Sequence, residues 1–217
     1  MRKNKKSPEH SYAEFAELVT RVMRDTSPRG VAETAYLFGE NIDNERASFG
    51  AARKLWRTGR ARTISIDDFG RAYGYEGFAH WRKKLIAAGI PRSAIHGMLI
   101  APDFPPSTHA EAWGLIRHAK KKKWRVIYVV APPVHMLRAF MTVVSAAVKE
   151  KSKLKIYSFP ADPERWETRA TYSQETWKAR RSDELRTELR KIEKYYRKGD
   201  MVSVREVLAY LNKRDRK

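Results

Sequence analysis

Short apolar segments, several rich in β-branched residues, recur along the chain with the pattern of buried strands. Segments with apolar residues three and four positions apart separate them, as in amphipathic helices. The clearest strand pattern is residues 126–130, which lie between basic residues and a pair of prolines. The pattern predicts strands at residues 31–38, 62–66, 94–100, 126–130 and 154–159.

Helix boundaries are marked by capping residues. Ser11 followed by Glu14, and Ser203 followed by Glu206, are capping boxes that predict helix starts. Thr108 followed by Glu111 predicts a third start of the same kind. Further helices are predicted at residues 44–56, 76–88 and 134–148, and one long or two joined helices at residues 173–197.

Alternation of strands and helices predicts the fold class. It implies right-handed crossovers and therefore a doubly wound α/β fold, Rossmann-like, with a mainly parallel sheet. Residues 1–30 are predicted to form a basic tail and an N-terminal helix, and residues 31–160 the α/β domain. Residues 161–217, where the alternation stops, are expected to form a C-terminal helical appendage packed on that domain.

Charge is the strongest compositional feature of the 217-residue chain. Lys and Arg total 45 against 25 acidic residues, which gives a net charge of +20. Such a field attracts nucleic acid or small anions, so a nucleic-acid partner is one hypothesis and a generally basic surface the other. The chain has no cysteine, no secretory signal and no apolar run long enough to span a membrane, and we therefore expect a cytoplasmic protein without a transmembrane segment.

Ligands of open parallel sheets bind outside the carboxyl ends of the strands. That rule selects the loops at residues 39–44, 67–73, 101–108 and 131–135. With the first turns of the helices that follow them, these loops carry acids, an imidazole, guanidinium groups and hydroxyls. The candidate site residues are Glu40, Asn41, Arg46, Asp67, Asp68, Ser107, Thr108, Glu111, His135 and Arg138.

His135 and Arg138 form the most informative pair among these candidates. They lie three residues apart at a helix start and so on one face, which suits an anion such as phosphate or carboxylate. The alternative is that His135 caps local backbone and Arg138 pairs with a nearby acid. Arg46 at a helix start opposes the helix dipole, which favours a charged partner beside it.

Several candidates also have purely structural explanations. The capping box alone would explain Thr108 and Glu111. Asp67 and Asp68 could hold a metal ion or a ribose, but a chain turn is the favoured interpretation. The other histidines show no metal-ligand spacing, so we assign neither a metal ion nor a cofactor, and the residues do not indicate an oligomeric state.

Three well-known motifs are missing from the sequence. No P-loop pattern is present, and no G-x-G-x-x-G follows the first predicted strand. No G-x-S-x-G elbow is present either, which argues against an α/β hydrolase.

The order and spacing of other residues resemble a known family. Gly39 and Arg46 follow the first strand, Ser107 and Thr108 precede a helix, and the strand at residues 126–130 leads into His135-Met136-x-Arg138-Ala139. In this order the segment from about residue 34 to residue 159 resembles the YdcF/SanA/ElyC-like proteins, bacterial domains of largely unassigned biochemistry. The pattern from Glu188 to Tyr195 is similar to the tails of some members.

The resemblance implies a Rossmann-like fold with a polar pocket lined by Arg46, Thr108, His135 and Arg138. Several members are linked to the bacterial envelope, but this chain has no membrane anchor. It also departs from the family where Glu40-Asn41 and Asp67-Asp68 replace glycine-rich turns, and where Glu111 stands for an asparagine.

Two functional hypotheses follow. The first is a protein that binds a small anionic ligand, phosphorylated or nucleotide-like, at the carboxyl edge of the sheet. If it is an enzyme, His135 would be the general acid or base, Arg46 and Arg138 would hold anionic oxygens, and acids such as Glu111 would assist. The second is a nucleic-acid-binding accessory protein with a vestigial pocket, whose binding would weaken steeply as salt rises.

Overall fold

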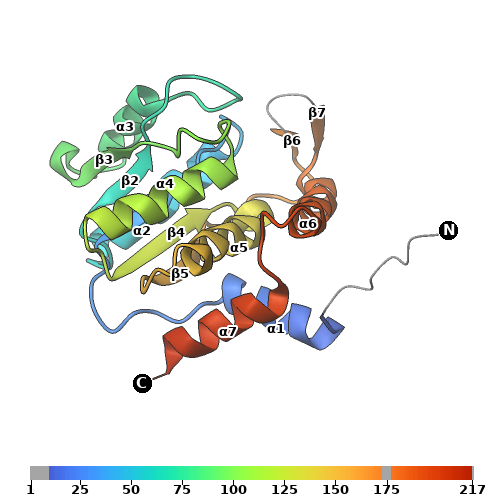
Figure 1. Ribbon diagram of the computed structural model, residues 1–217. Helices are drawn as coiled ribbons and strands as arrows, with labels where there is room; N and C mark the ends of the chain where they lie inside the picture. Colours follow the sequence, from blue (N-terminus) through green and yellow to red (C-terminus); the bar gives the residue numbers. More distant parts are fainter. Residues whose placement is uncertain (1–9, 173–176, 217) are drawn as a thin grey trace.

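A computed structural model describes residues 10–172 and 177–216, and in them five parallel strands form the central sheet (Figure 1). The order β3-β2-β1-β4-β5 places the first and fourth strands side by side, with crossovers to both sides of that pair. This confirms the predicted doubly wound fold. The strands are β1 Thr34–Leu37, β2 Ile64–Asp67, β3 Ile95–Met98, β4 Val126–Ala131 and β5 Lys155–Pro160.

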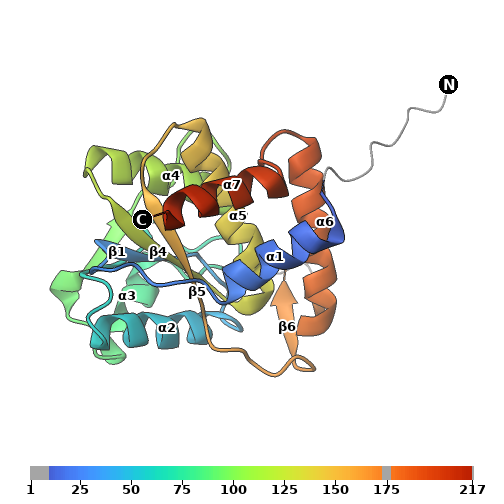
Figure 2. The same cartoon turned by 90° about the horizontal axis from the view of Figure 1, so that it is seen from below.

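Alternate residues of the central strands enter two cores. Ile127 and Val129 of β4 face one core, while Tyr128 and Val130 face the other, as the period of a strand requires. Helices α2 Glu45–Arg57 and α3 Phe78–Ala87 cover one face of the sheet, and α1 Tyr12–Met23, α4 Thr108–Lys121 and α5 Pro133–Lys149 cover the other (Figure 2).

The ends of the observed strands lie within three residues of the predicted ends, and most of the observed strands are shorter than predicted. Asp67, expected in a loop, is the last residue of β2 because it continues the parallel register opposite Met98 of β3. Residues 31–33 lie outside β1, although Ala32 makes a single bridge with Ala61.

Two of the three predicted capping boxes are present. Ser11 with Glu14 begins α1, and Ser203 with Glu206 begins α7 Val204–Asp215. The third prediction is wrong: the N-cap of α4 is Ser107, whose hydroxyl accepts from the N–H of Ala110 at 3.3 Å, and Thr108 is the first helical residue.

The region after β5 differs from the prediction at its start. A long helix was expected from residue 173, but an antiparallel hairpin of β6 Arg169–Tyr172 and β7 Trp177–Arg180 precedes α6 Arg181–Arg197. Residues 173–176, which the prediction also included, lie outside the described residues. The hairpin is attached to the loop between β1 and α2, because the N–H of Thr171 donates to Asp43 and Asn41 donates to the carbonyl of Thr171.

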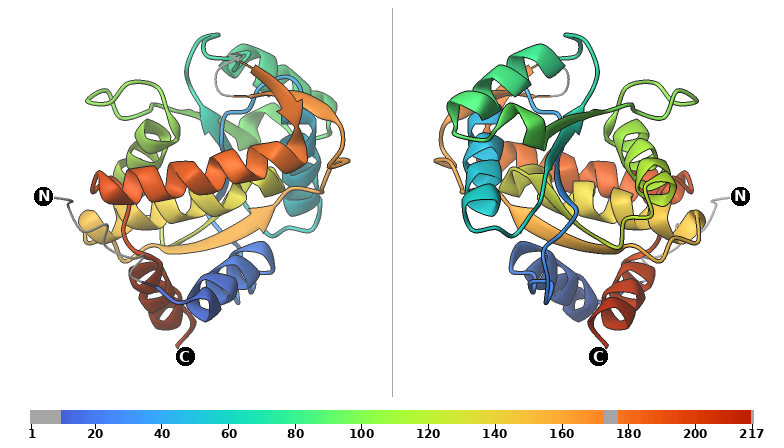
Figure 3. Two further views of the ribbon diagram at one scale, coloured as in Figure 1. Left: turned by 90° about the vertical axis from the view of Figure 1, so that its right-hand side faces the viewer. Right: turned by 90° about the vertical axis from the view of Figure 1, so that its left-hand side faces the viewer.

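Helices α6 and α7 pack on the outer side of the helical layer that α1, α4 and α5 form. Figure 3 shows α6 running alongside α5, and α1 beside α7. A buried ion pair fixes α7: Arg214 lies 2.5 Å from Asp25, which follows α1, and also donates to the carbonyl of Ile156. Among the described residues, no helix is both long and apolar enough to cross a membrane.

Candidate functional site

A polar cleft of about 380 Å³ opens at the carboxyl ends of the strands, where the loops after β1 and β4 meet the start of α4 and the side of α6. Because β1 and β4 are neighbours whose crossovers run in opposite directions, this is the switch point at which open α/β sheets bind ligands. Eight of the ten predicted site residues line it. They are Glu40, Asn41, Asp67, Ser107, Thr108, Glu111, His135 and Arg138.

A carboxylate, an imidazole and a hydroxyl form a hydrogen-bonded chain in the cleft. His135 Nδ1 lies 2.6 Å from Glu40 Oε1, and His135 Nε2 lies 3.3 Å from Thr108 Oγ1. Glu40 and His135 are 9% and 8% exposed, and the imidazole packs edge-on against Phe38 with the ring centres 5.8 Å apart. The three groups come from the β1–α2 loop, α5 and α4, so the sheet order brings them together.

Arg138 lies on the same face of α5 as His135, one turn further along. Its Nη1 donates to Thr108 Oγ1 at 2.9 Å, and its other nitrogens bind the carboxylate of Glu188 from α6. Lys191 also contacts Glu188, at 2.7 Å. Burial raises the pKa of the Glu188 carboxyl, but the charges of Arg138 and Lys191 more than offset this and hold it at about 2.

Glu111 joins α4 to the first loop. Its Oε2 accepts from Tyr36 Oη at 2.9 Å and from the N–H of Gly39 at 3.0 Å. Burial raises the pKa of Glu111 well above its ordinary value, and the neighbouring carboxylate of Asp67 adds to the shift. In a glycine-rich turn a phosphate would accept from a backbone N–H such as that of Gly39. Here the carboxyl group of Glu111 already accepts from it.

Asp67 at the end of β2 lies on the opposite wall of the cleft from α6. Its side chain is buried, and its Oδ1 has no hydrogen-bond partner among the described residues. Burial, together with the charge of Asp68, raises the pKa of Asp67 to about 7. A ligand that donates a hydrogen bond would satisfy this oxygen.

A second unpartnered carboxyl oxygen belongs to Glu184 of α6, which also lines the cleft. Burial, with a contribution from Glu188, raises the pKa of Glu184 to about 7, although Lys191 lies 3.5 Å away. At neutral pH Asp67 and Glu184 are thus only partly ionised, which limits the negative charge of the cleft.

Two predicted site residues do not line the cleft. Arg46 is exposed, because the first turn of α2 buries Glu45 and Ser48 and leaves position 46 on the outer side. The prediction that Arg46 shares a cavity with His135 and Arg138 is therefore wrong. Asp68 is also exposed and lies against Gly97 of β3, because successive residues along a strand point to opposite sides.

The site residues predicted from the sequence include none from α6, although that helix forms one wall of the cleft. Glu184, Glu188, Lys191 and Tyr195 line the cleft at successive turns of that helix. The signal was present as polar residues at helical spacing, since Glu184 and Glu188 are four apart and Lys191 three further. A helix charged on most faces does not reveal which of its faces is buried.

Metal binding has no support from clustering in this structure: the part of the chain that the structure describes contains no group of three or more His, Asp or Glu side chains arranged to hold a metal ion. The carboxylates of the cleft are instead engaged with tyrosine, backbone, histidine, arginine and lysine partners, apart from the free oxygens of Asp67 and Glu184.

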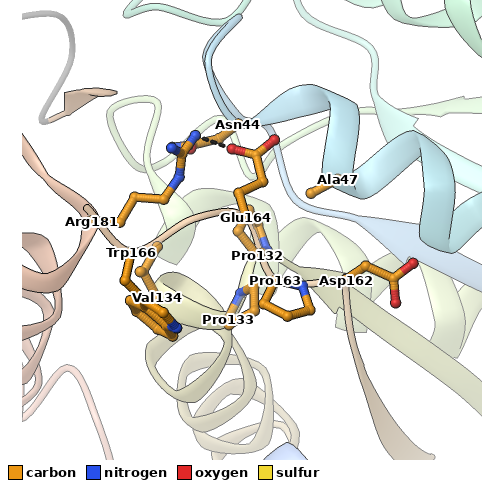
Figure 4. Close-up of a pocket in the computed structure, with 10 residues that line it drawn as sticks. All are labelled: Asn44, Ala47, Pro132, Pro133, Val134, Asp162, Pro163, Glu164, Trp166 and Arg181. Atoms are coloured by element: carbon orange, nitrogen blue, oxygen red, sulfur yellow. Dashed lines mark hydrogen bonds and ion pairs between the residues drawn. The ribbon is translucent and has the colours of Figure 1, made fainter. Parts of the chain in front are cut away.

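A second cavity of about 10 Å³ lies where the segment after β5 crosses the loop after β1 (Figure 4). Arg181 at the start of α6 forms an ion pair with Glu164 and donates to Asn44 Oδ1 and to the carbonyl of Asp43. The space would hold about one water molecule. These contacts tie α6 to the β1–α2 loop and so fix the wall of the main cleft.

No known family profile, no curated protein and no solved structure matches this chain.

Proposed function

We propose that the cleft binds a small polar ligand that carries hydroxyl groups at one end and a singly charged anionic group at the other, as a nucleotide-like molecule does. The volume of about 380 Å³ falls in the usual range for small-molecule sites, about 300–1,000 Å³. The position at the switch point is where such folds bind their ligands.

The observation that carries the proposal is the free carboxyl oxygen of Asp67 at the end of β2. In dinucleotide-binding folds an acidic residue after the second strand accepts from ribose hydroxyls. Asp67 occupies the corresponding place, and a buried acceptor without a partner is costly until a donor reaches it.

The anionic end belongs on the opposite side of the cleft in this proposal. His135, Arg138 and Lys191 lie there, beside the first turn of α4. Glu40 and Glu188 lie there too, so a group with several negative charges would be repelled. One negative charge, as on a carboxylate or a phosphodiester, fits this balance better than a triphosphate.

We also propose that the chain belongs to the YdcF/SanA/ElyC-like family, on the segment from β4 to His135-Met136-x-Arg138-Ala139. The support is that Thr108 contacts both His135 and Arg138, and these three residues carry the resemblance. Arg46, which the resemblance also implies, lies outside the cleft.

The first test is mass spectrometry of small molecules that remain bound through native purification. The second is calorimetric titration with adenosine 3′,5′-cyclic monophosphate, whose phosphodiester carries one negative charge, and with adenosine and dimethyl phosphate separately. We expect the nucleotide to bind more tightly than either part alone. Replacement of Asp67 with Ala should weaken binding about tenfold or more, the value of a hydrogen bond to a charged group.

The matched control is Asp68→Ala, which removes the neighbouring carboxylate outside the cleft. Equal losses in Asp67→Ala and Asp68→Ala would show that charge rather than contact matters. Absence of binding by all three probes, with no carried ligand, would refute the proposed function.

A further inference from the structure

The chain Glu40–His135–Thr108 has the order of a nucleophilic catalytic triad: an acid orients an imidazole, and the imidazole contacts a hydroxyl. The two contacts are 2.6 and 3.3 Å long, within or just beyond the reach expected before substrate binds. They involve the two different ring nitrogens, so that the acid holds one while the other can take the hydroxyl proton.

The available donors and acceptors fix the direction of the chain. A guanidinium group can only donate, so Thr108 Oγ1 accepts from Arg138. An ionised Glu40 can only accept, so His135 Nδ1 carries the proton between them. In the neutral imidazole Nε2 is then an acceptor, which can take the hydroxyl proton of Thr108.

Thr108 is free for this role because it does not cap its helix. Ser107 is the N-cap of α4, and Thr108 is its first residue, partly exposed to the cleft.

Groups that could stabilise a developing negative charge lie next to this hydroxyl. Arg138 Nη1 is 2.9 Å from Thr108 Oγ1. The first N–H groups of a helix lack intrahelical acceptors, and no hydrogen bond within the described residues occupies those of Thr108 and His109.

We propose that the cleft catalyses acyl transfer from a small carboxylic ester, with Thr108 as the nucleophile, His135 as the base and Glu40 as the positioning residue. Thr108 Oγ1 forms a bond to the acyl carbon, and its proton passes to His135 Nε2. The carbon–oxygen bond to the alcohol then breaks, and His135 returns the proton to the leaving oxygen. Water repeats these steps on the threonyl ester and releases the carboxylic acid.

An ester is the favoured substrate because its tetrahedral oxyanion and its carboxylate product each carry one negative charge. Glu40 and Glu188 flank the reacting groups, and they would repel the dianion of a phosphate monoester more strongly. This inference uses the cleft of the proposed function but does not depend on the identity of the nucleotide-like ligand.

The test is incubation of the full chain with p-nitrophenyl acetate, followed by acid quench, peptide mapping by mass spectrometry and measurement of released p-nitrophenol. We expect an initial burst and one acetyl group on the peptide that contains Thr108. Thr108→Ala should abolish the burst and that label, whereas Thr108→Ser should keep both. His135→Ala should slow acetylation by about 10²-fold or more.

Glu40→Gln tests positioning, because it should lower the maximal acetylation rate while leaving the ester concentration for half-maximal rate unchanged. Thr20→Ala and His96→Ala are matched controls on exposed positions of α1 and β3 and should behave as the unaltered protein. Circular dichroism of each variant checks that it is folded.

Acetylation that persists in Thr108→Ala, that falls on Ser107, or that is absent from the folded unaltered protein would overturn the inference. Faster release from p-nitrophenyl phosphate than from the acetate would also overturn it. Titration of the same variants with adenosine 3′,5′-cyclic monophosphate separates the two proposals. Binding without acetylation refutes the triad alone, and acetylation without binding refutes the nucleotide-like ligand alone.

Discussion

Replacement of Arg138 with methionine would leave the buried carboxylate of Glu188 with Lys191 as its remaining cationic contact. The Arg138 and Glu188 side chains are 12% and 5% exposed, so water screens their interaction weakly. The favourable contacts lower the pKa of Glu188 from 4.5 to about 2 despite its burial. At about 1.4 kcal/mol per tenfold change, the shift corresponds to about 3 kcal/mol net of burial, and Arg138 is its largest favourable contributor.

We therefore expect Arg138→Met to lower the free energy of unfolding at pH 7 by about 3 kcal/mol, measured by urea denaturation. Because the folded-state pKa of Glu188 is depressed, its contribution is fully present above pH 4.5 and is lost as the pH falls towards 2. The stability difference between the variant and the unaltered protein should shrink over that range.

The double variant Arg138→Met/Glu188→Leu is the control for this reasoning. Removing both members of a buried ion pair is often nearly neutral, so it should recover most of the stability that the single variant loses. A single-variant loss below about 1 kcal/mol, or a double variant no more stable than the single one, would refute the assignment of this energy to the Arg138–Glu188 ion pair.

Three other changes test separate features. Asp67→Asn should raise the free energy of unfolding at pH 8 by about 4 kcal/mol at most but not at pH 3, because a carboxyl whose folded pKa is raised to about 7 costs stability once it ionises. Asp68→Asn should give a smaller gain at pH 8, because the charge of Asp68 causes only the lesser part of that shift, and an equal gain from Asp67→Asn at both pH values would contradict the prediction. Gly114→Ala should lower the free energy of unfolding by about 1–3 kcal/mol, measured by urea denaturation, because the added Cβ would lie 2.5 Å from the carbonyl oxygen of Leu99. An unchanged denaturation midpoint would show that the backbone at Leu99 shifts to make room at no cost in stability. If the +20 charge serves nucleic acid, binding of an RNA oligonucleotide should weaken steeply between 50 and 200 mM salt, by roughly 10³-fold for six phosphate contacts, and an absence of binding at low salt would reject that partner.

The parallel sheet was predictable because its strands read as buried apolar runs and each crossover helix has a clear apolar face. The location of the cleft followed from the same alternation, since strand ends meet at one edge. His135 and Arg138 lie together for a local reason, their three-residue spacing on α5.

The remaining features depend on contacts between distant residues. The N-cap of α4 is Ser107 and not the predicted Thr108. Glu111, predicted to complete the capping box, instead binds Tyr36 and Gly39, which are 75 and 72 residues away in the chain. The direction in which Arg46 points depends on how α2 is rotated about its axis, and the packing of α2 on the sheet determines that rotation. The hairpin before α6 was hidden because its bonds run to the β1–α2 loop, more than a hundred residues earlier.

The wall that α6 adds to the cleft supplies lining residues from a helix that is not part of the sheet or its crossovers. The sheet and its five flanking helices are complete before residue 161, yet Glu184, Glu188 and Lys191 reach the cleft from the segment that follows. Exchanging that one helix would change which ligand fits without disturbing the strands, provided that a carboxylate still meets Arg138. Ligand preference in such a scaffold can therefore diverge rapidly between related proteins while Glu40, His135 and Thr108 stay in place.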